Sequence, residues 1–103
     1  MPQAAERWER RAWDACIYGL GERTAIELEM RLRDVQAVRR RYELKRRDDP
    51  PEHFLLLIAD TRHNRRVLAE FGDLFQDLPR LRPSVVRACL AAGRHPPTGL
   101  LLV

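Results

Sequence analysis

The chain has 103 residues, of which 45% are hydrophobic and 33% charged, and its formal net charge is +4. This length predicts one domain over residues 1–103 with a modest hydrophobic core. No apolar run approaches the roughly 18 residues that cross a bilayer, and the first residues lack the apolar stretch of a secretory signal. We therefore expect a cytoplasmic protein without a membrane partner, in which Cys16 and Cys89 are reduced thiols.

The first third of the sequence predicts a β-hairpin. Residues 1–11 form either a short helix or a lead-in arm, and the sequence leaves both open. Alternating apolar and polar residues then predict strands over 12–18 and 24–33. The intervening Gly-Leu-Gly-Glu sequence at 19–22 is typical of a turn.

The rest of the sequence alternates between helical and strand patterns. Asp34 can cap a helix over 35–48, which two aspartates and two prolines end. The apolar run 54–60 predicts a strand buried on both faces. Two further helices and a terminal strand are expected over about 63–76, 84–92 and 99–103. This order predicts a small α/β domain with a mixed sheet of about four strands flanked by helices.

The second predicted strand separates apolar from charged residues. Its alternation puts Ile26, Leu28, Met30 and Leu32 on one face, and Glu27, Glu29, Arg31 and Arg33 on the other. We expect the following helix to cover the Ile26 and Leu28 side. The two glutamates would then lie on the face that points away from this helix.

A third carboxylate joins the glutamates if the hairpin has a particular register. A turn at 19–22 pairs Tyr18 with Arg23, which places Asp14 across from Glu27. Opposed like charges destabilise a sheet, and a divalent cation between them would reverse that effect. Asp14, Glu27 and Glu29 therefore form either a site for Mg²⁺ or Mn²⁺ or a solvated face with ordinary salt bridges.

The helix over 35–48 carries two cationic side chains where apolar ones are expected. At 100° per residue, Arg41 and the chain's only lysine, Lys45, fall inside the arc of apolar positions. A charged group there costs free energy unless it has a partner. Lys45 is level with Glu27 and Glu29 if the helix runs back along the sheet.

Arginine accounts for 18 of the 19 basic residues, and several arginines are clustered. The planar guanidinium group suits phosphate recognition, so the clusters indicate either a nucleic-acid-binding surface or a solvated helix face. The candidates are Arg39, Arg40, Arg46, Arg47, Arg62, Arg65 and Arg66.

The remaining polar positions carry weaker signals. His53, His63 and His95 lack zinc-ligand spacing. Residues 60–65, after the buried strand, form either an anion site or, more simply, a capping turn. Trp8 and Trp13 are expected to be packing residues rather than platforms for bases.

The acidic strands, the helix and the buried strand together resemble the core of PD-(D/E)XK, or restriction-endonuclease-like, nucleases. More narrowly, the segments RAWDACI, ELEMRLRDVQAVRRR, LKRRD and LLLIADTRHNRRVL are similar to a domain found behind helix-turn-helix modules in bacterial transcriptional regulators. The similarity covers about residues 10–103. Two departures from the pattern are that little chain precedes the Asp-bearing strand and that no helix-turn-helix module is present.

The resemblance implies a role for four residues. Asp14 matches the first acid of the motif, Glu27 and Glu29 the second, and Lys45 a catalytic lysine moved onto the following helix. Gln36 corresponds to a helix glutamine near the site in certain exonuclease branches.

The function that the resemblance implies is a Mg²⁺- or Mn²⁺-dependent phosphodiesterase acting on DNA. The alternative is a catalytically inactive module that serves regulation, DNA binding or dimerisation. Its partner would be a second copy of the chain or a protein that carries a DNA-binding module.

Overall fold

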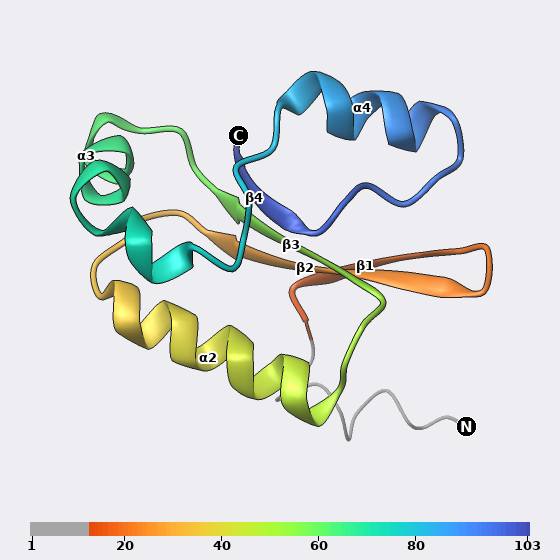
Figure 1. The fold of residues 1–103 in the computed structure, drawn as a ribbon, viewed down its shortest axis with the longest axis horizontal. Coiled ribbons are helices and arrows are strands. Elements are labelled where there is room, and N and C mark those ends of the chain that lie inside the picture. Colours follow the sequence, from red (N-terminus) through yellow and green to blue (C-terminus); the bar gives the residue numbers. More distant parts are fainter. Residues whose placement is uncertain (1–12) are drawn as a thin grey trace.

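A computed structural model describes residues 13–103, and the predicted helix or arm at 1–11, with Trp8, lies outside that range. The described chain forms an open four-stranded sheet in the order β1-β2-β3-β4 (Figure 1). Strands β1 and β2 are antiparallel, and β2, β3 and β4 are parallel. The elements are β1 (Ala15–Gly19), β2 (Glu22–Glu29), α2 (Val35–Asp48), β3 (His53–Ile58), α3 (Arg62–Phe71), the 3-10 helix η2 (Gly72–Phe75), α4 (Pro83–Ala91) and β4 (Gly99–Leu102). The predicted α/β class with a mixed four-stranded sheet is confirmed.

The hairpin has the predicted register but a tighter turn. Gly19 pairs with Glu22, so only Leu20 and Gly21 connect the strands, with φ of 55° and 73°. Positive φ at both central residues is what a type I′ two-residue hairpin turn requires. Tyr18 faces Arg23, as predicted.

Strand β2 ends at Glu29 and not at residue 33. Beyond Glu29, the buried side chain of Asn64 takes the place of a neighbouring strand as the hydrogen-bond partner of the backbone. The Asn64 amide is fully buried; it donates to the carbonyl oxygens of Met30 (2.9 Å) and Ala59 (2.8 Å) and accepts from the Leu32 N–H (2.8 Å). His63 Nε2 donates to the Leu32 carbonyl oxygen at 2.7 Å. The β2–α2 loop is thereby fixed to the start of α3.

The helix boundaries follow local capping signals. Asp34 caps α2 by accepting from the Ala37 N–H at 3.0 Å, as predicted. Thr61 caps α3 by accepting from the Asn64 N–H at 3.1 Å. The predicted helix over 63–76 changes at Gly72 into η2.

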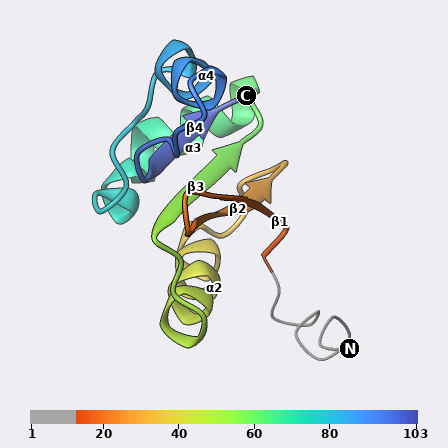
Figure 2. The ribbon, with the colours of Figure 1, turned by 90° about the vertical axis from the view of Figure 1, so that its right-hand side faces the viewer.

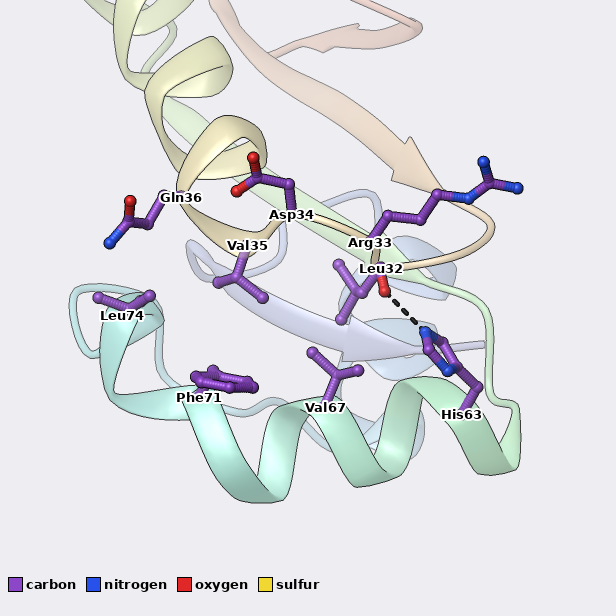
Figure 3. A pocket seen from close by; sticks show the side chains of 9 residues that line it. All are labelled: Leu32, Arg33, Asp34, Val35, Gln36, His63, Val67, Phe71 and Leu74. Carbon is purple, nitrogen blue, oxygen red and sulfur yellow. Dashed lines mark hydrogen bonds between the residues drawn. The ribbon is translucent and has the colours of Figure 1, made fainter.

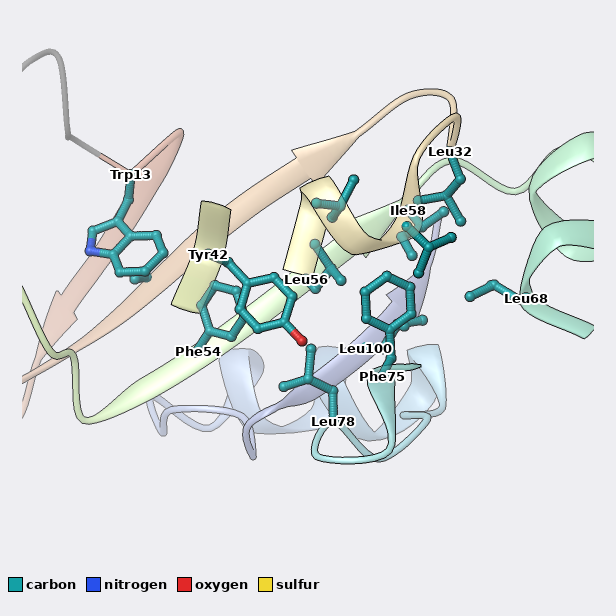
Figure 4. Close-up of a cluster of buried hydrophobic side chains, with 13 residues drawn as sticks. Trp13, Leu32, Tyr42, Phe54, Leu56, Ile58, Leu68, Phe75, Leu78 and Leu100 are labelled. Carbon is teal, nitrogen blue, oxygen red and sulfur yellow. The ribbon is translucent and has the colours of Figure 1, made fainter. Parts of the chain in front are cut away.

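Helices α2 and α4 lie on opposite sides of the sheet (Figures 1 and 2). The main core lies between the sheet, α2 and η2 (Figure 4). In it the ring of Tyr42 is 5.1 Å from that of Phe54 and 6.3 Å from that of Phe75, centroid to centroid. Aromatic pairs at such distances contribute stability beyond the burial of their area.

The expectation about which face of β2 the helix covers is wrong. Ala25 is fully buried and Glu27 is 4% exposed in the face toward α2, whereas Leu28 and Met30, on the other face, are 42% and 67% exposed. Strand β3 is apolar on both faces, so its sequence does not favour one face of the sheet over the other for α2. Strand order and the right-handedness of β-α-β crossovers decide the face instead.

Residues 79–81 close the outer edge of β4. Leu100 N–H donates to the Pro79 carbonyl oxygen, and Leu81 N–H donates to that of Leu100, both at 2.8 Å. A Cβ atom on Gly99 would lie 2.5 Å from the Pro79 oxygen, so only glycine permits this approach.

We predict that Asn64→Ala lowers the free energy of unfolding by roughly 2–4 kcal/mol, because it removes the partners of the Leu32 N–H and the Met30 carbonyl oxygen. Urea denaturation measures the loss. Glu70→Ala, an exposed position on the same helix, is the control and should change stability by less than about 0.5 kcal/mol. We call these hydrogen bonds of the Asn64 side chain the Asn64 clamp, and a loss below about 1 kcal/mol for Asn64→Ala would contradict its role.

Candidate active site

The hairpin register brings Asp14 to Glu27. Ala15, the first residue of β1, pairs with Ile26, and Asp14 lies in the bend just before it, beside Glu27. The Asp14 carboxylate accepts a hydrogen bond from the Leu28 N–H at 2.8 Å, which ties it to β2. Asp14 is exposed and Glu27 is buried, so solvent reaches this pair of carboxylates from the side of Asp14.

Helix α2 supplies one cation to each glutamate of β2. Lys45 Nζ forms an ion pair with Glu27 Oε1, and Arg41 forms one with Glu29 Oε2. The cations are four residues apart, about 6 Å along a helix, and the glutamates are two residues apart, about 6.6 Å along a strand. The two rises match, and α2 runs back along β2. Arg41 and Lys45 therefore have the partners that their place in the apolar arc requires.

The Glu27–Lys45 pair is shielded from water, whereas the Glu29–Arg41 pair is not. The side chains of Glu27 and Lys45 are 5% and 16% exposed, but that of Arg41 is 49% exposed. Burial raises the pKa of Glu27, the Lys45 ammonium opposes this rise, and the neighbouring Asp14 carboxylate adds to it. Lys45 Nζ also lies 5.7 Å from the ring centroid of Trp13, which is 7% exposed in the core, as expected for a packing residue.

Two carboxylates of unequal burial suit a hard divalent cation. Mg²⁺ is commonly held by one or two carboxylates and completes its coordination with water and substrate phosphate. Within residues 13–103, no group of three or more Asp, Glu, His or Cys side chains is arranged to hold a metal. Glu27 and Glu29 are each engaged by a cation of α2, so one metal ion shared by Asp14, Glu27 and Glu29 stays a prediction. Asp14 and Glu27 are the pair that could hold a metal.

The predicted phosphate-binding arginines fall into two groups. Four are engaged by carboxylates: Arg39 with Glu43, Arg46 with Asp77, Arg47 with Asp48 and Arg65 with Asp60. Arg39 and Arg46 are also partly buried and not fully exposed as predicted; Arg39 donates to the Leu74 carbonyl oxygen, and Arg46 lies over the Phe54 ring. Arg40, Arg62 and Arg66 are exposed, without an ion pair to any residue that the structure describes. These three keep their guanidinium groups available to a phosphate backbone.

Gln36 lies in the first turn of α2, nine residues before Lys45 or roughly 13 Å along the helix axis. The structure therefore does not bring it to Glu27 and Lys45. Gln36 instead lines a pocket of about 410 Å³ between this turn and α3 (Figure 3). The pocket's apolar residues are Leu32, Val35, Val67, Phe71 and Leu74. Sequence reasoning missed this pocket, because its walls come from segments about 30 residues apart.

The histidines have structural partners. His53 and His95 stack with ring centroids 4.8 Å apart, and His95 Nε2 donates to the Gly19 carbonyl oxygen at 2.7 Å. His63 holds the β2–α2 loop. Residues 60–65 form the capping turn, with Asp60 paired to Arg65.

Comparisons with protein-family models, with curated proteins and with solved structures found no match to this chain. Among residues 13–103, no helix is both long enough and apolar enough to cross a membrane.

We predict that Glu27 and Lys45 are energetically coupled. Glu27→Gln and Lys45→Met should each lower the free energy of unfolding by roughly 1–3 kcal/mol. Each substitution removes the opposite charge from the remaining member of the buried pair. The double variant should lose clearly less than the sum, with a coupling of about 1 kcal/mol or more. Urea denaturation of the four proteins at pH 7 without divalent cations measures it.

The less buried pair Arg39–Glu43 on the same helix, with side chains 32% and 49% exposed, serves as the control. Its cycle, with Arg39→Met and Glu43→Gln, should give a coupling of about 0.5 kcal/mol or less. Equal couplings in the two cycles would show that burial adds nothing to the Glu27–Lys45 pair.

Proposed function

We propose that this chain is a divalent-metal-dependent phosphodiesterase of the PD-(D/E)XK type that acts on DNA in the cytoplasm. The observation that carries the proposal is the buried Lys45–Glu27 pair beside Asp14. It unites an acid from the residue just before the first strand, an acid from the second strand and a lysine from the following helix. The two unpaired thiols, Cys16 and Cys89, are compatible with the cytoplasm.

The residues divide the chemistry between them. Asp14 and Glu27 would hold Mg²⁺ or Mn²⁺, which supplies Lewis-acid activation of a phosphoryl oxygen and of water. Lys45, fixed against Glu27, directs a positive charge toward the phosphate and stabilises the negative charge that develops there. Arg41 keeps Glu29 oriented beside this site.

The alternative is an inactive regulatory, DNA-binding or dimerisation module. The observation that favours it is that Lys45 and Arg41 already neutralise Glu27 and Glu29. In addition, Leu28 and Met30 present apolar surface on the opposite face of β2, which a second copy or a partner with a DNA-binding module could cover. Cleavage distinguishes the two functions.

We predict that Mn²⁺ binds the wild-type protein and that Asp14→Asn and Glu27→Gln each weaken binding at least about tenfold, as loss of groups that shape a metal site does. Isothermal titration calorimetry measures the affinity. Lys45→Met should keep Mn²⁺ affinity but slow the nicking of supercoiled plasmid by about 100-fold or more, because it removes a charge that acts on the transition state.

Glu70→Gln, an exposed carboxylate on α3, is the matched control and should retain both properties. Equal Mn²⁺ affinities of the wild type and Glu27→Gln would contradict the proposed metal site. Metal binding without any plasmid cleavage would favour the inactive module.

We further predict that Arg62 and Arg66 bind DNA phosphates. Replacing both with serine should lower the slope of log affinity against log salt by about 0.9 for each duplex phosphate that the protein no longer neutralises. Fluorescence anisotropy between about 50 and 200 mM salt measures the slope. Arg87→Ser with Arg94→Ser, two exposed arginines in and just after α4, removes the same charge and should leave the slope nearly unchanged. Equal flattening in both double variants would indicate a general charge effect.

A further inference from the structure

We propose that the pocket between the first turn of α2 and α3 binds one unstacked nucleobase of a single-stranded segment of the substrate. This inference rests on the proposed function for its substrate class and adds a second binding site to it. The pocket's volume of about 410 Å³ lies within the range of small-molecule sites.

The pocket offers a flat aromatic surface. Phe71, at the last position of α3, is 51% exposed, and its ring lies beside Val67 toward Val35 (Figure 3). Exposed aromatic rings are platforms on which splayed bases stack, and they tolerate any base because every base has a π-face. The apolar side chains beside the ring would exclude water from the other surfaces of the base.

The polar groups of the pocket suit the edge of a base. Gln36 forms no side-chain hydrogen bond with any residue in 13–103, so its amide can both donate and accept. His63 uses Nε2 on the Leu32 carbonyl oxygen, which leaves Nδ1 for a ligand. Asp34 also lines the pocket, but its carboxylate caps α2.

Charge at the rim favours a ligand attached to phosphates. Arg33 lines the pocket on the side away from Phe71, where its side chain extends outward (Figure 3), and it is exposed without an ion pair in the described part of the chain. An aromatic platform, hydrogen-bonding side chains and a neighbouring guanidinium group together fit a nucleotide better than a purely apolar ligand.

The position of the pocket fits a strand that leaves the proposed catalytic site. The pocket residue Val35 precedes Lys45 by ten residues on α2, which corresponds to about 15 Å along the helix axis. That distance equals about four stacked nucleotides at 3.4 Å each. A base can enter the pocket only when it is unpaired, so the substrate would contain a single-stranded segment.

The test measures binding without cleavage. Fluorescein-labelled 12-nucleotide single strands are titrated in EDTA and followed by anisotropy, with one abasic position moved along the strand. Phe71→Ala should weaken binding of the intact strand by about fivefold to a hundredfold, the effect of losing one stacked base. One abasic position should weaken wild-type binding similarly and have little further effect on Phe71→Ala.

Two more variants separate stacking from folding. Phe71→Leu keeps apolar volume at the site but removes the ring, and it should bind like Phe71→Ala. Leu90→Ala, on α4 and 43% exposed, should bind like the wild type. Thermal unfolding of each variant identifies any loss that is due to destabilisation.

Additive losses for Phe71→Ala and every abasic position would overturn the base pocket, as would no measurable affinity for the intact strand at about 50 mM salt, where phosphate contacts are strongest. The outcome is independent of catalysis. Plasmid nicking with an unaffected Phe71→Ala variant overturns only the pocket, and a strand-specific Phe71 effect without nicking overturns only the phosphodiesterase.

Discussion

The way in which α2 lies on the sheet depends on the ion pair between Lys45 of this helix and the buried Glu27 of β2. A carboxylate that is 4% exposed is costly to charge, and Lys45 offsets this cost from the facing helix. Replacing a buried ion pair with packed apolar residues is often neutral or stabilising, so such a pair is weak evidence for a stabilising role. Its presence beside Asp14 therefore supports the proposed role of this pair in a metal site. The raised pKa of Glu27 fits this view, because perturbed groups are concentrated at functional sites.

The same pair fixes how the helix lies on the sheet. With Lys45 on Glu27 and Arg41 on Glu29, a shift of α2 by one turn would separate both cations from their carboxylates. The aromatic contacts of Tyr42, between these two positions on the helix, add a packing constraint on the same register. The proposed site and the main hydrophobic core thus share one interface, so the geometry of the site is supported by the core.

The Asn64 clamp connects this interface to the pocket. By taking the backbone groups of Met30 and Leu32, it ends β2 immediately after the acidic residues and turns the chain toward α2. The loop that results forms one wall of the pocket, and α3, which carries Asn64 itself, forms another. A single buried amide therefore sets both the length of the acidic strand and the shape of the neighbouring cavity.

The sequence by itself determined the order of the elements, the Asp34 cap and the hairpin register, because these depend on contacts between residues close together in the chain. It also showed that Arg41 and Lys45 need partners. Only the tertiary structure decided that α2 covers the acidic face, since a strand apolar on both faces is compatible with a helix on either side. The early end of β2, the pocket and the Arg46–Asp77 pair likewise depend on segments distant in sequence, whose side chains meet only when the sheet and its helices are assembled.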